Sequence, residues 1–587
     1  MTVHFCSRLL GTIVGGLLLI VSISAQEEPP PPPTPPAAQE GVEVMARGPV
    51  HEAYAEPTEV RPQASPLVEK QPPDPIDELP PDQRPEGDNV QWIPGYWAWD
   101  QDQNDFLWVS GFWRTPPPGR QWVPGNWQQV EGGWQWVAGF WAPAGQEELQ
   151  YVPPPPPSLD EGPSVPAPDA NSAYVPGAWI YRQSRFLWRP GFWNAYRPGW
   201  VWIPAHYVWT PGGYLFVEGY WDHPLEARGL LFAPVRLAAR LLGRARWAFT
   251  PSYVVQPDFL LGALFVRPAV GHYYFGDYFE PRYTRAGFVP WIDYRVGRSV
   301  FDPNFNYYRL GFARYGGWER ALRNLYQARF RGDIPRPPRT LVQQNEVIRN
   351  ITTNRTMNEV VNRSINLTNA QNVSVLAPLS RVNNTRVTNL AALASVREGE
   401  AKLPHIANPV LKMQAVSREQ RGQEQKTAAQ LHALAQQRQK MEGRLLSDGG
   451  PPVRVTDKPK QGKIELPRPA QPPRPTPPIS PKPDGKPTPP RVAPPPPALP
   501  KHEDKPIPRH EAPRPPAPPK QVAPPPKPPT PPKQVKPPTP PPPPKTTPPP
   551  PPKKETPPPP PKKEPPPPPK KEPPKKEPPK KEPPKKG

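Results

Sequence analysis

Cysteine is nearly absent from this chain of 587 residues, because Cys6 is the only one. A single thiol can form no disulfide within the chain and cannot build a thiolate metal site. The nine histidines show no spacing typical of metal ligands. The sequence also lacks a phosphate loop, a dinucleotide fingerprint and a Gly-x-Ser-x-Gly elbow. We therefore expect no enzyme, and we predict no catalytic residue, no cofactor-binding residue and no metal ligand.

Long apolar runs are scarce as well. The longest one follows Arg8 and covers residues 9–23, which is short for a membrane span. Small residues come next, so residues 1–25 are predicted to be a secretory signal peptide that is cut before Gln26. An uncleaved anchor is the alternative. We expect no transmembrane span in the mature chain and an extracytoplasmic location, in the periplasm or the cell envelope.

The basic charge of the chain is concentrated in its proline-rich tail. Residues 451–587 carry 30 Lys and Arg against 11 Asp and Glu, whereas residues 27–90 carry 14 acidic against 4 basic residues. Both stretches are poor in aromatic residues, so we predict a disordered acidic spacer at 26–90 and a disordered Pro/Lys-rich tail at 448–587. The tail is either a solvated brush or a cationic tether to peptidoglycan or another anionic envelope polymer. Nucleic acid is not an expected partner, because the aromatic part of the chain is not basic.

Aromatic residues are concentrated in one part of the chain. Residues 92–221 hold 17 of the 20 tryptophans. They also repeat the pattern aromatic-x-x-Gly-x-aromatic eight times, mostly at a step of 14 residues. A fixed period of this kind indicates supersecondary units that bury their apolar faces against one another. The copies start at Trp92, Trp108, Trp122, Trp136, Tyr174, Trp188, Trp202 and Phe216.

Each copy is predicted to be a short β-strand segment between Gly/Pro turns. The two aromatics of a copy are five residues apart, so a regular strand would point them to opposite faces. We infer a bulge or tight turn at the glycine, which supplies backbone freedom and puts both rings on one face. A Pro-Gly type II turn that folds the copy back on itself is the competing geometry. Ala205 is the only residue that replaces the glycine.

The fold class that follows is mainly β. Short antiparallel β-meander repeats occupy residues 91–150 and 174–224, and a Pro-rich linker at 151–173 separates the two blocks. A small mixed α/β region rich in Arg and aromatics follows at 225–340. Within it we predict a basic amphipathic helix at about residues 230–244, kinked or started near Pro234. We also predict strands at Tyr253–Val255 and at residues 259–266, and two further helices. One of these helices is capped by Asp302, and the other runs from Trp318 to Phe330.

The C-terminal half is predicted to contain less structure. Residues 341–415 are rich in Asn and Thr and should be weakly ordered. Residues 416–447 form a Gln-rich helix that opens with a capping box of Ser417 and Gln420. Its apolar residues fall at heptad-like spacing, but Arg438 lies in that seam, so the pattern does not establish a coiled coil.

The rings of the repeats have two possible roles. They either form the core of a minimal β array, or some of them lie exposed in a row and stack on sugar faces. The titratable residues that come nearest to a constellation are His206, His223, His272 and Asp222, around the junction between the repeats and the region that follows, and we expect them to be packed rather than ligating. The candidate packing or ligand aromatics are Trp92, Trp97, Trp108, Trp113, Trp122, Trp127, Trp136, Trp141, Trp179, Trp188, Trp193, Trp202 and Trp221.

The repeated Trp-Val-Pro-Gly-x-Trp phrase resembles the bacterial W-x-x-G-x-W repeat family, also written Y-x-W-G-x-W, of exported proteins. The resemblance covers residues 92–221, and the whole arrangement is similar to large planctomycete proteins of this kind. It implies export and a cell-envelope setting, and it implies no activity. Two hypotheses follow: a non-catalytic envelope scaffold or interaction protein with other proteins as partners, or a glycan or cell-wall binder that uses exposed Trp rows.

Overall fold

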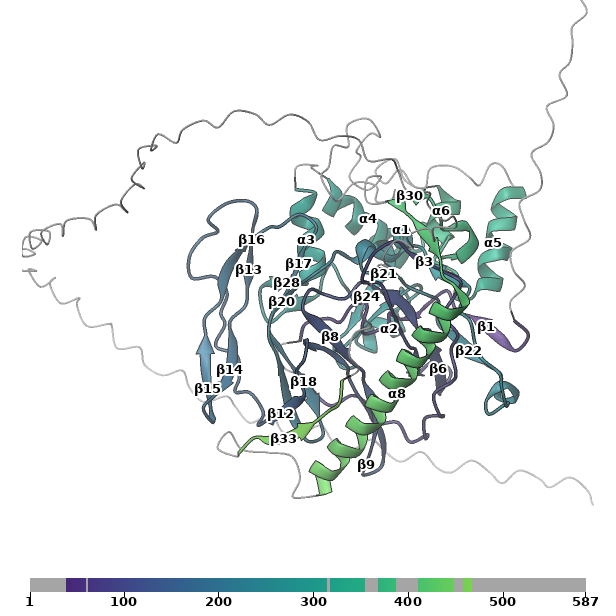
Figure 1. The fold of residues 1–587 in the computed structure, drawn as a ribbon. Coiled ribbons are helices and arrows are strands. Elements are labelled where there is room, and N and C mark those ends of the chain that lie inside the picture. Colours follow the sequence, from purple (N-terminus) through teal and green to yellow (C-terminus); the bar gives the residue numbers. More distant parts are fainter. Residues whose placement is uncertain are drawn as a thin grey trace, which may run out of the picture. The chain divides into compact units, whose positions relative to one another are not determined.

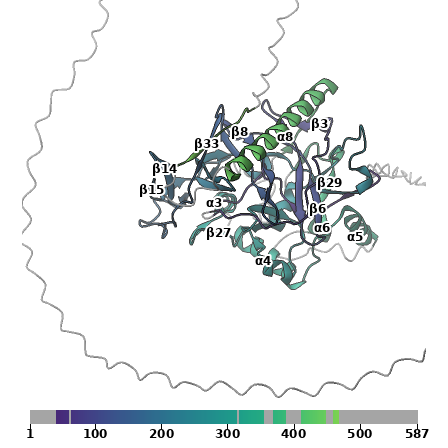
Figure 2. The same cartoon turned by 90° about the horizontal axis from the view of Figure 1, so that it is seen from below.

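A computed structural model describes residues 39–59, 62–313, 317–353, 368–386, 410–447 and 458–466 (Figures 1 and 2). The predicted signal peptide, residues 26–38 of the predicted spacer and nearly all of the predicted tail lie outside the described residues. So do residues 354–367 and 387–409 of the Asn/Thr-rich segment. The described part is mainly β, with many short antiparallel strand pairs and a few helices. The predicted fold class is therefore confirmed.

The eight copies of the motif pair two by two into four antiparallel hairpins. Each copy contributes two strands, one on each side of its Pro-Gly step or the equivalent step. Hairpin 1 consists of β4 (Gln91–Ile93), β5 (Tyr96–Asp100), β6 (Asp105–Val109) and β7 (Phe112–Arg114). Hairpin 2 consists of β8 (Arg120–Val123), β9 (Asn126–Val130), β10 (Gly133–Val137) and β11 (Phe140–Pro143). Hairpin 3 consists of β13 (Ser172–Val175), β14 (Ala178–Arg182), β15 (Arg185–Arg189) and β16 (Phe192–Ala195). Hairpin 4 consists of β17 (Val201–Ile203), β18 (His206–Thr210), β19 (Gly213–Val217) and β20 (Tyr220–Asp222).

The register sets aromatic against aromatic in every hairpin. In hairpin 1, Trp97 pairs with Trp108 and Trp92 pairs with Trp113. The ring centroids of these pairs are 5.1 and 5.3 Å apart and meet edge to face, which is a favoured geometry for aromatic pairs. The pairs Trp127 with Trp136, Trp179 with Trp188 and Trp202 with Trp221 repeat the arrangement. Two copies, and not one, therefore form the structural unit.

The glycine of the motif interrupts both strands of a hairpin at the same level. In hairpin 1 the ladder stops after Ile93 and resumes at Tyr96, while the partner strand stops at Val109 and resumes at Phe112. Two residues are skipped on each side, so no bulge is present, because a bulge adds a residue to one strand only. The motif glycines are not among the residues with positive φ, which also excludes the type II turn. Both predicted geometries are therefore wrong, and the feature is a symmetric break.

The glycines are required for space and not for backbone freedom. A methyl carbon on Gly125 would lie 2.4 Å from Cζ2 of Trp136, and one on Gly139 would lie 2.4 Å from Cζ2 of Trp122. Each glycine thus receives the first aromatic ring of the partner copy, and the contact is reciprocal. In hairpin 4, Ala205 holds the glycine position, and the copy opposite it begins with Phe216, which pairs with Tyr207. The single ring of Phe216 lacks the indole atom that approaches the glycines in the other hairpins.

The remaining strands tie the hairpins to segments before and after them. Two sheets include strands of hairpin 1, with the orders β1-β22-β6-β5 and β21-β7-β4, and a third joins hairpin 4 in the order β18-β19-β12-β33. A sheet outside the hairpins has the order β2-β25-β24-β26. The strands are β1 (Val42–Val44), β2 (Gly48–Pro49), β3 (Gln83–Pro85), β12 (Glu148–Val152), β21 (Gly229–Leu230), β22 (Val235–Leu237), β23 (Tyr253–Val255), β24 (Leu264–Arg267), β25 (His272–Phe275), β26 (Val289–Pro290), β27 (Arg295–Val296), β28 (Val300–Phe301), β29 (Leu376–Pro378), β30 (Thr385–Arg386), β31 (Val410–Leu411), β32 (Met413–Ala415) and β33 (Lys460–Lys463).

The helices cover the α/β region and one side of the hairpins. Asp302 caps α3 by accepting from the backbone N–H of Phe305, and α4 ends at Gly332 with a left-handed φ of +80°, so both of these predicted helices are confirmed. The strand at Tyr253–Val255 is confirmed too. Of the predicted strand at 259–266, only the last residues belong to β24, because α1 and a 3-10 turn precede it. The helices are α1 (Pro257–Leu260), α2 (Pro281–Arg285), α3 (Pro303–Gly311), α4 (Trp318–Arg331), α5 (Leu341–Thr353), α6 (Asn369–Val373) and α8 (Arg418–Ser447).

The basic amphipathic helix expected at about residues 230–244 does not form. This segment contains β21, β22 and a 3-10 turn at Ala239–Leu241. Its backbone pairs with hairpin 1, where Leu230 faces Trp113 and Val235 faces Trp108. Pro234 between these strands lacks an N–H and would interrupt a helix. The strand edges of hairpin 1 therefore override the helical pattern of the sequence.

The Gln-rich helix is confirmed as α8, and its capping box is present. Ser417 Oγ accepts from Gln420 N, and Gln420 Oε1 accepts from Ser417 N. Figure 1 shows α8 running across strands of the first two hairpins. Its buried face includes Leu431, Leu434 and Arg438. The heptad-like spacing thus serves packing on a β surface.

The predicted disordered spacer is wrong for its described part, residues 39–59 and 62–90. Val42–Val44 pairs with β22, and Pro49 pairs with Tyr274 of β25. Tyr54, Val68 and Ile76 are buried in the main core. The acidic composition misled the prediction, because two of the acids are themselves buried and satisfied by hydrogen bonds. The Pro-rich linker also needs a small correction, since its first two residues complete β12.

Candidate functional site

The break in hairpin 1 surrounds a buried carboxylate. Glu78 Oε1 accepts from Trp108 Nε1 at 2.7 Å and from the backbone N–H of Gly111 at 3.0 Å. Its Oε2 accepts from the N–H of Gly95 at 2.8 Å and, more distantly, from Gly111. The interrupted ladder leaves these N–H groups without a strand partner, and a buried N–H needs an acceptor. Glu78 is the acceptor for the glycine N–H groups of both copies of hairpin 1.

Hairpin 2 repeats the arrangement with a second glutamate. Glu52 accepts from Trp136 Nε1 at 3.1 Å and from the N–H of Gly125 at 3.2 Å. The N–H of Gly139 is a further donor to it. On the opposite side of the same peptides, Arg438 of α8 donates to the carbonyls of Pro124 and Ala138, at 3.0 and 2.8 Å.

Arg438 also pairs with Glu442 at 2.8 Å, and both side chains are fully buried. The glycine peptides of hairpin 2 are therefore held between an anion and a cation. Each group lies where the exposed ends of the peptide dipoles favour its charge.

Hairpin 3 uses an aspartate from the Pro-rich linker. Asp160 Oδ1 accepts from the hydroxyl of Tyr174 at 2.7 Å and from the N–H of Gly177 at 3.2 Å. Tyr174 is the first aromatic of its copy and lies over Gly191. Three hairpins thus share one design, in which a carboxylate joins a motif glycine to the polar atom of a ring. We call this design the carboxylate lock.

The two glutamates of the locks are perturbed by burial. Desolvation raises the pKa of Glu78 to about 7, while the hydrogen bonds from Trp108, Gly111 and Gly95 act in the opposite direction. Desolvation also raises the pKa of Glu52, and Arg438 opposes it. His272 lies 3.8 Å from Glu52, and burial lowers the pKa of that imidazole to about 4. The histidine is therefore neutral at pH 7.

A buried ion pair joins hairpin 1 to hairpin 4. Arg114 follows the last ring of hairpin 1, Asp222 follows the last ring of hairpin 4, and their bidentate contacts are both 2.8 Å. Arg228 Nε lies 3.0 Å from the same carboxylate. All three side chains are at most 3% exposed. Such a buried pair needs full hydrogen bonding to offset its desolvation. Arg114 makes a further hydrogen bond by donating to the carbonyl of Ala53.

The four residues that the sequence grouped as a titratable cluster do not converge on one cavity. Asp222 is committed to the two arginines, and His272 lies beside Glu52. His206 contacts the carbonyl of Pro204, and His223 packs on the ring of Trp200. Within the described ranges, no group of three or more His, Cys, Asp or Glu is arranged to hold a metal ion.

The predicted aromatics divide by hairpin. Those of hairpins 1 and 2 are buried, except for the partly buried Trp127, and the predicted tryptophans of hairpins 3 and 4 are all partly buried. The buried rings are Trp92, Trp97, Trp108, Trp113, Trp122, Trp136 and Trp141. The partly buried rings are Trp127, Trp179, Trp188, Trp193, Trp202 and Trp221. The first half of the repeat region therefore serves the core, and the second half leaves part of its ring surface accessible.

Hairpin 3 is the most exposed of the four. Leu187 and Phe192 are 40% and 38% exposed. Its three tryptophans do not belong to the main core cluster, and in Figure 1 its strands β13 to β16 lie at one edge of the described part. Apolar surface of this kind, grouped on one element, is a candidate interaction surface.

The sequence did not reveal the lock residues Glu52, Glu78 and Asp160, because they come from stretches classified as spacer or linker. One usable signal is that each lies among apolar residues and near proline in an otherwise polar stretch, as in Ile-Asp-Glu78-Leu-Pro. The structure brings them to Gly95, Gly177 and Gly125 across 17 to 73 residues of chain.

Comparison with known proteins identifies the repeat and nothing more. The WXXGXW repeat model matches residues 87–114 and 197–221. These two ranges cover hairpin 1 and hairpin 4, so one repeat of the model corresponds to one hairpin of two copies. Neither the curated proteins nor the solved structures contain a match. None of the helices in the described residues is both long and apolar enough for a membrane span.

Proposed function

We propose that this chain is a non-catalytic, exported scaffold or interaction protein of the cell envelope. The observation that carries the proposal is how the buried charges are used. Glu78 is surrounded by N–H donors, and Asp222 is held by two arginines. A catalytic acid or base needs access to a substrate proton, whereas these groups are enclosed and hold hairpins together. These enclosed charges support the role of a scaffold that holds its surface in a fixed arrangement for binding partners.

Envelope attachment through the tail is the second part of the proposal. The excess of lysine over acidic residues at 451–587 favours contact with anionic polymers by multiplicity. The test is fractionation of cells that carry the full chain with an epitope tag. We expect the tag in the envelope fraction and its release at high salt, because screening weakens such contacts. A full-length control with the lysines of residues 553–586 changed to glutamine should be released at low salt.

Two results would contradict these expectations separately. A tag in the cytosol would refute export. Equal retention of this lysine-depleted control would refute attachment through charge and leave the scaffold proposal standing on its fold.

A second candidate function is binding of glycan or cell-wall material through hairpin 3. It is favoured by the partly exposed rings of Trp179, Trp188 and Trp193, because aromatic faces stack on sugars. The test is sedimentation of the full chain with isolated sacculi. Trp188→Ala should lower retention, while the matched exposed-aliphatic control Leu187→Ala should not. Unchanged retention of a folded Trp188→Ala variant would reject this function.

A further inference from the structure

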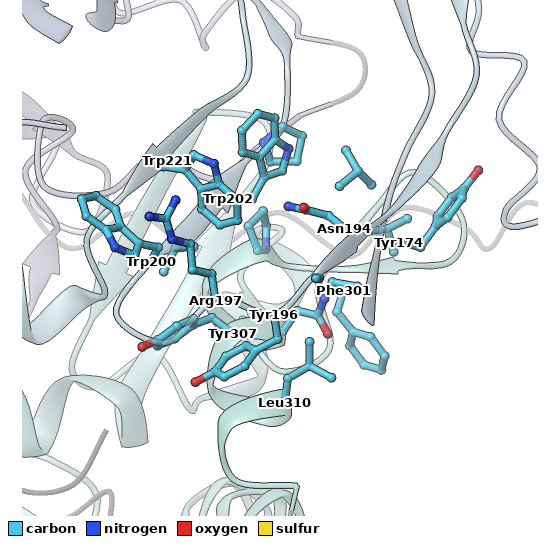
Figure 3. Close-up of a pocket in the computed structure, with 18 residues that line it drawn as sticks. Tyr174, Asn194, Tyr196, Arg197, Trp200, Trp202, Trp221, Phe301, Tyr307 and Leu310 are labelled. Atoms are coloured by element: carbon cyan, nitrogen blue, oxygen red, sulfur yellow. The ribbon is translucent and has the colours of Figure 1, made fainter. Parts of the chain in front are cut away.

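A pocket opens where hairpin 3, hairpin 4 and α3 meet. Figure 3 shows Trp200, Trp202, Trp221 and Arg197 around one side of it, and the labelled Tyr307 and Leu310 come from α3. The cavity volume is about 50 Å³. One water molecule needs roughly 10–15 Å³ by the same measure, so the pocket has room for the tip of an acidic side chain.

The break of hairpin 4 lies at this pocket and differs from the other three. Trp202 covers Gly219, with its Cζ2 2.7 Å from the position of a methyl carbon on that glycine. It therefore occupies the place that Tyr174 has in hairpin 3. The indole Nε1 of Trp202 is buried and has no hydrogen-bond partner. Among the described residues, no carboxylate is hydrogen-bonded to the indole of Trp202 or to the N–H of Gly219, whereas Glu78, Glu52 and Asp160 fill this role elsewhere.

Trp92 provides the comparison that makes Trp202 unusual. Its Nε1 is also without a partner, but its hairpin already holds Glu78, which accepts from Trp108. Trp92 is 0% exposed, and no ligand can reach it. Trp202 is only partly buried and lines the pocket.

Arg197 provides a cation at the wall of the pocket. The Arg197 guanidinium lies 5.4 Å from the ring centre of Trp200 and 5.6 Å from that of Trp221. It is exposed, and it forms no ion pair with any residue that the structure describes. Stacking on these two rings holds the charge at the wall of the pocket that Trp202 also lines. The site therefore offers one buried donor and one cation, which together suit a carboxylate.

We propose that the pocket of hairpin 4 binds an Asp or Glu side chain of an extended, proline-containing segment of a partner protein. The inference goes beyond the scaffold function and does not depend on where the protein resides. The occupant is argued from the three locks of the chain itself. Each of their acids lies on a non-helical segment within three residues of a proline, namely Pro49, Pro80 and Pro157. A partner segment of this kind would complete the fourth lock in trans.

The probe is a fluorescein-labelled peptide with the sequence of residues 155–165, which supplies Asp160 to hairpin 3. Its binding to the full chain is measured by fluorescence anisotropy. We expect saturable binding that weakens with salt, and no binding of the same peptide with Asp160→Asn and Glu161→Gln. Trp202→Phe removes the indole N–H and keeps a ring. It should weaken binding about tenfold, since a hydrogen bond to a charged group is worth that much.

Arg197→Gln should weaken binding about two- to fivefold, as an exposed charge pair allows. Arg185→Gln is the matched control, because this exposed arginine lies at the tip of hairpin 3 and does not line the pocket. It should bind the peptide as the wild type does. Melting curves of all variants show whether each one is folded, and Arg197→Gln keeps the test decisive even where Trp202→Phe is unstable.

Three results would overturn the proposal. The first is equal binding of the acidic and the amide peptide. The second is unchanged affinity in both folded variants. The third is no binding of the acidic peptide by the full chain, whether the pocket has no affinity or one of the chain's own segments fills it. Binding of an oligogalacturonate in place of the peptide would assign the pocket to sugar acids and would equally refute a protein partner.

Discussion

Replacing Glu78 by glutamine tests whether the carboxylate lock stabilises the fold. Glu78 accepts from Trp108 and Gly111 on one oxygen and from Gly95 on the other. Glutamine keeps one acceptor and turns the other oxygen into a donor. Whichever way the amide is oriented, a backbone or indole N–H then faces an NH2 group.

The magnitude follows from the number of groups left unsatisfied. At least one N–H of the hairpin and the new amide NH2 lose their partners, and each such buried group costs about 1–3 kcal/mol. We therefore expect Glu78→Gln to lower the free energy of unfolding by about 2–6 kcal/mol, which is a large part of a typical total of about 5–15 kcal/mol. The shape of the side chain is unchanged, so packing does not contribute.

Urea unfolding followed by tryptophan fluorescence measures this loss. The matched control is Glu69→Gln, since Glu69 belongs to the same segment but is exposed. It should stay within about 0.5 kcal/mol of the wild type. If Glu78→Gln had an equally small effect on the free energy of unfolding, the carboxylate would not contribute to stability and the lock would not be a stabilising device.

Three further outcomes are expected. Gly139→Ala should lower the free energy of unfolding by several kcal/mol or prevent folding, because the new methyl carbon would lie 2.4 Å from a ring carbon. Gly422→Ala in α8 is the control: its methyl group has open space, so it should raise the free energy of unfolding by up to about 1 kcal/mol in the same urea assay. Folding raises the pKa of Glu78 from 4.5 to about 7, so protonation of this group favours the folded state. The stability that it contributes to the fold is fully present below pH 4.5 and is lost as the pH rises through 7. The stability gap between wild type and Glu78→Gln should therefore be up to about 3 kcal/mol larger at pH 4.5 than at pH 8, and a gap that grew with pH would contradict this. Finally, Phe216→Trp should lower the free energy of unfolding by about 1–3 kcal/mol by crowding Ala205. Adding Ala205→Gly to this variant should restore most of that loss. If the effects of the two substitutions simply added up in a double-mutant cycle, the two residues would not be in contact.

Local chemistry explains what could be predicted from the sequence. The strands follow from alternating aromatics between turn residues, and the helix starts at Asp302 and Ser417 follow from capping preferences. These signals act within a few residues of chain. The 14-residue step indicated a repeated antiparallel unit, but the sequence did not show that two copies pair into one hairpin.

The locks could not be predicted, because their acids come from segments outside the repeats, 17 residues before the glycine in hairpins 1 and 3 and 73 before Gly125 in hairpin 2. The contacts of α8 are more remote, since Glu442 bonds Asn126 and Tyr151 across about three hundred residues. Composition classified the segments around Glu52 and Glu78 as disordered, since few apolar residues are present. A segment with few apolar residues can still be ordered when its acids satisfy N–H groups that a neighbouring sheet leaves open. Composition counts such acids as solvated, and this is why it failed here.

The glycine of the motif was predicted for the wrong physical reason, and the eight copies explain why. A glycine in a sequence signals either positive φ or close approach, and only the φ value of a structure separates the two. Internal comparison contains the missing information. The only copy with alanine at the glycine position faces the only copy that begins with phenylalanine. A residue needed for φ would have no reason to vary with the ring across the hairpin, whereas a residue needed for space would. The substitution pair therefore argues that the glycine and the ring opposite it form one packing unit. Hairpin 4 therefore has a phenyl ring where the other three hairpins have an indole, and Trp202 is the one ring that begins a copy of this hairpin and carries an N–H.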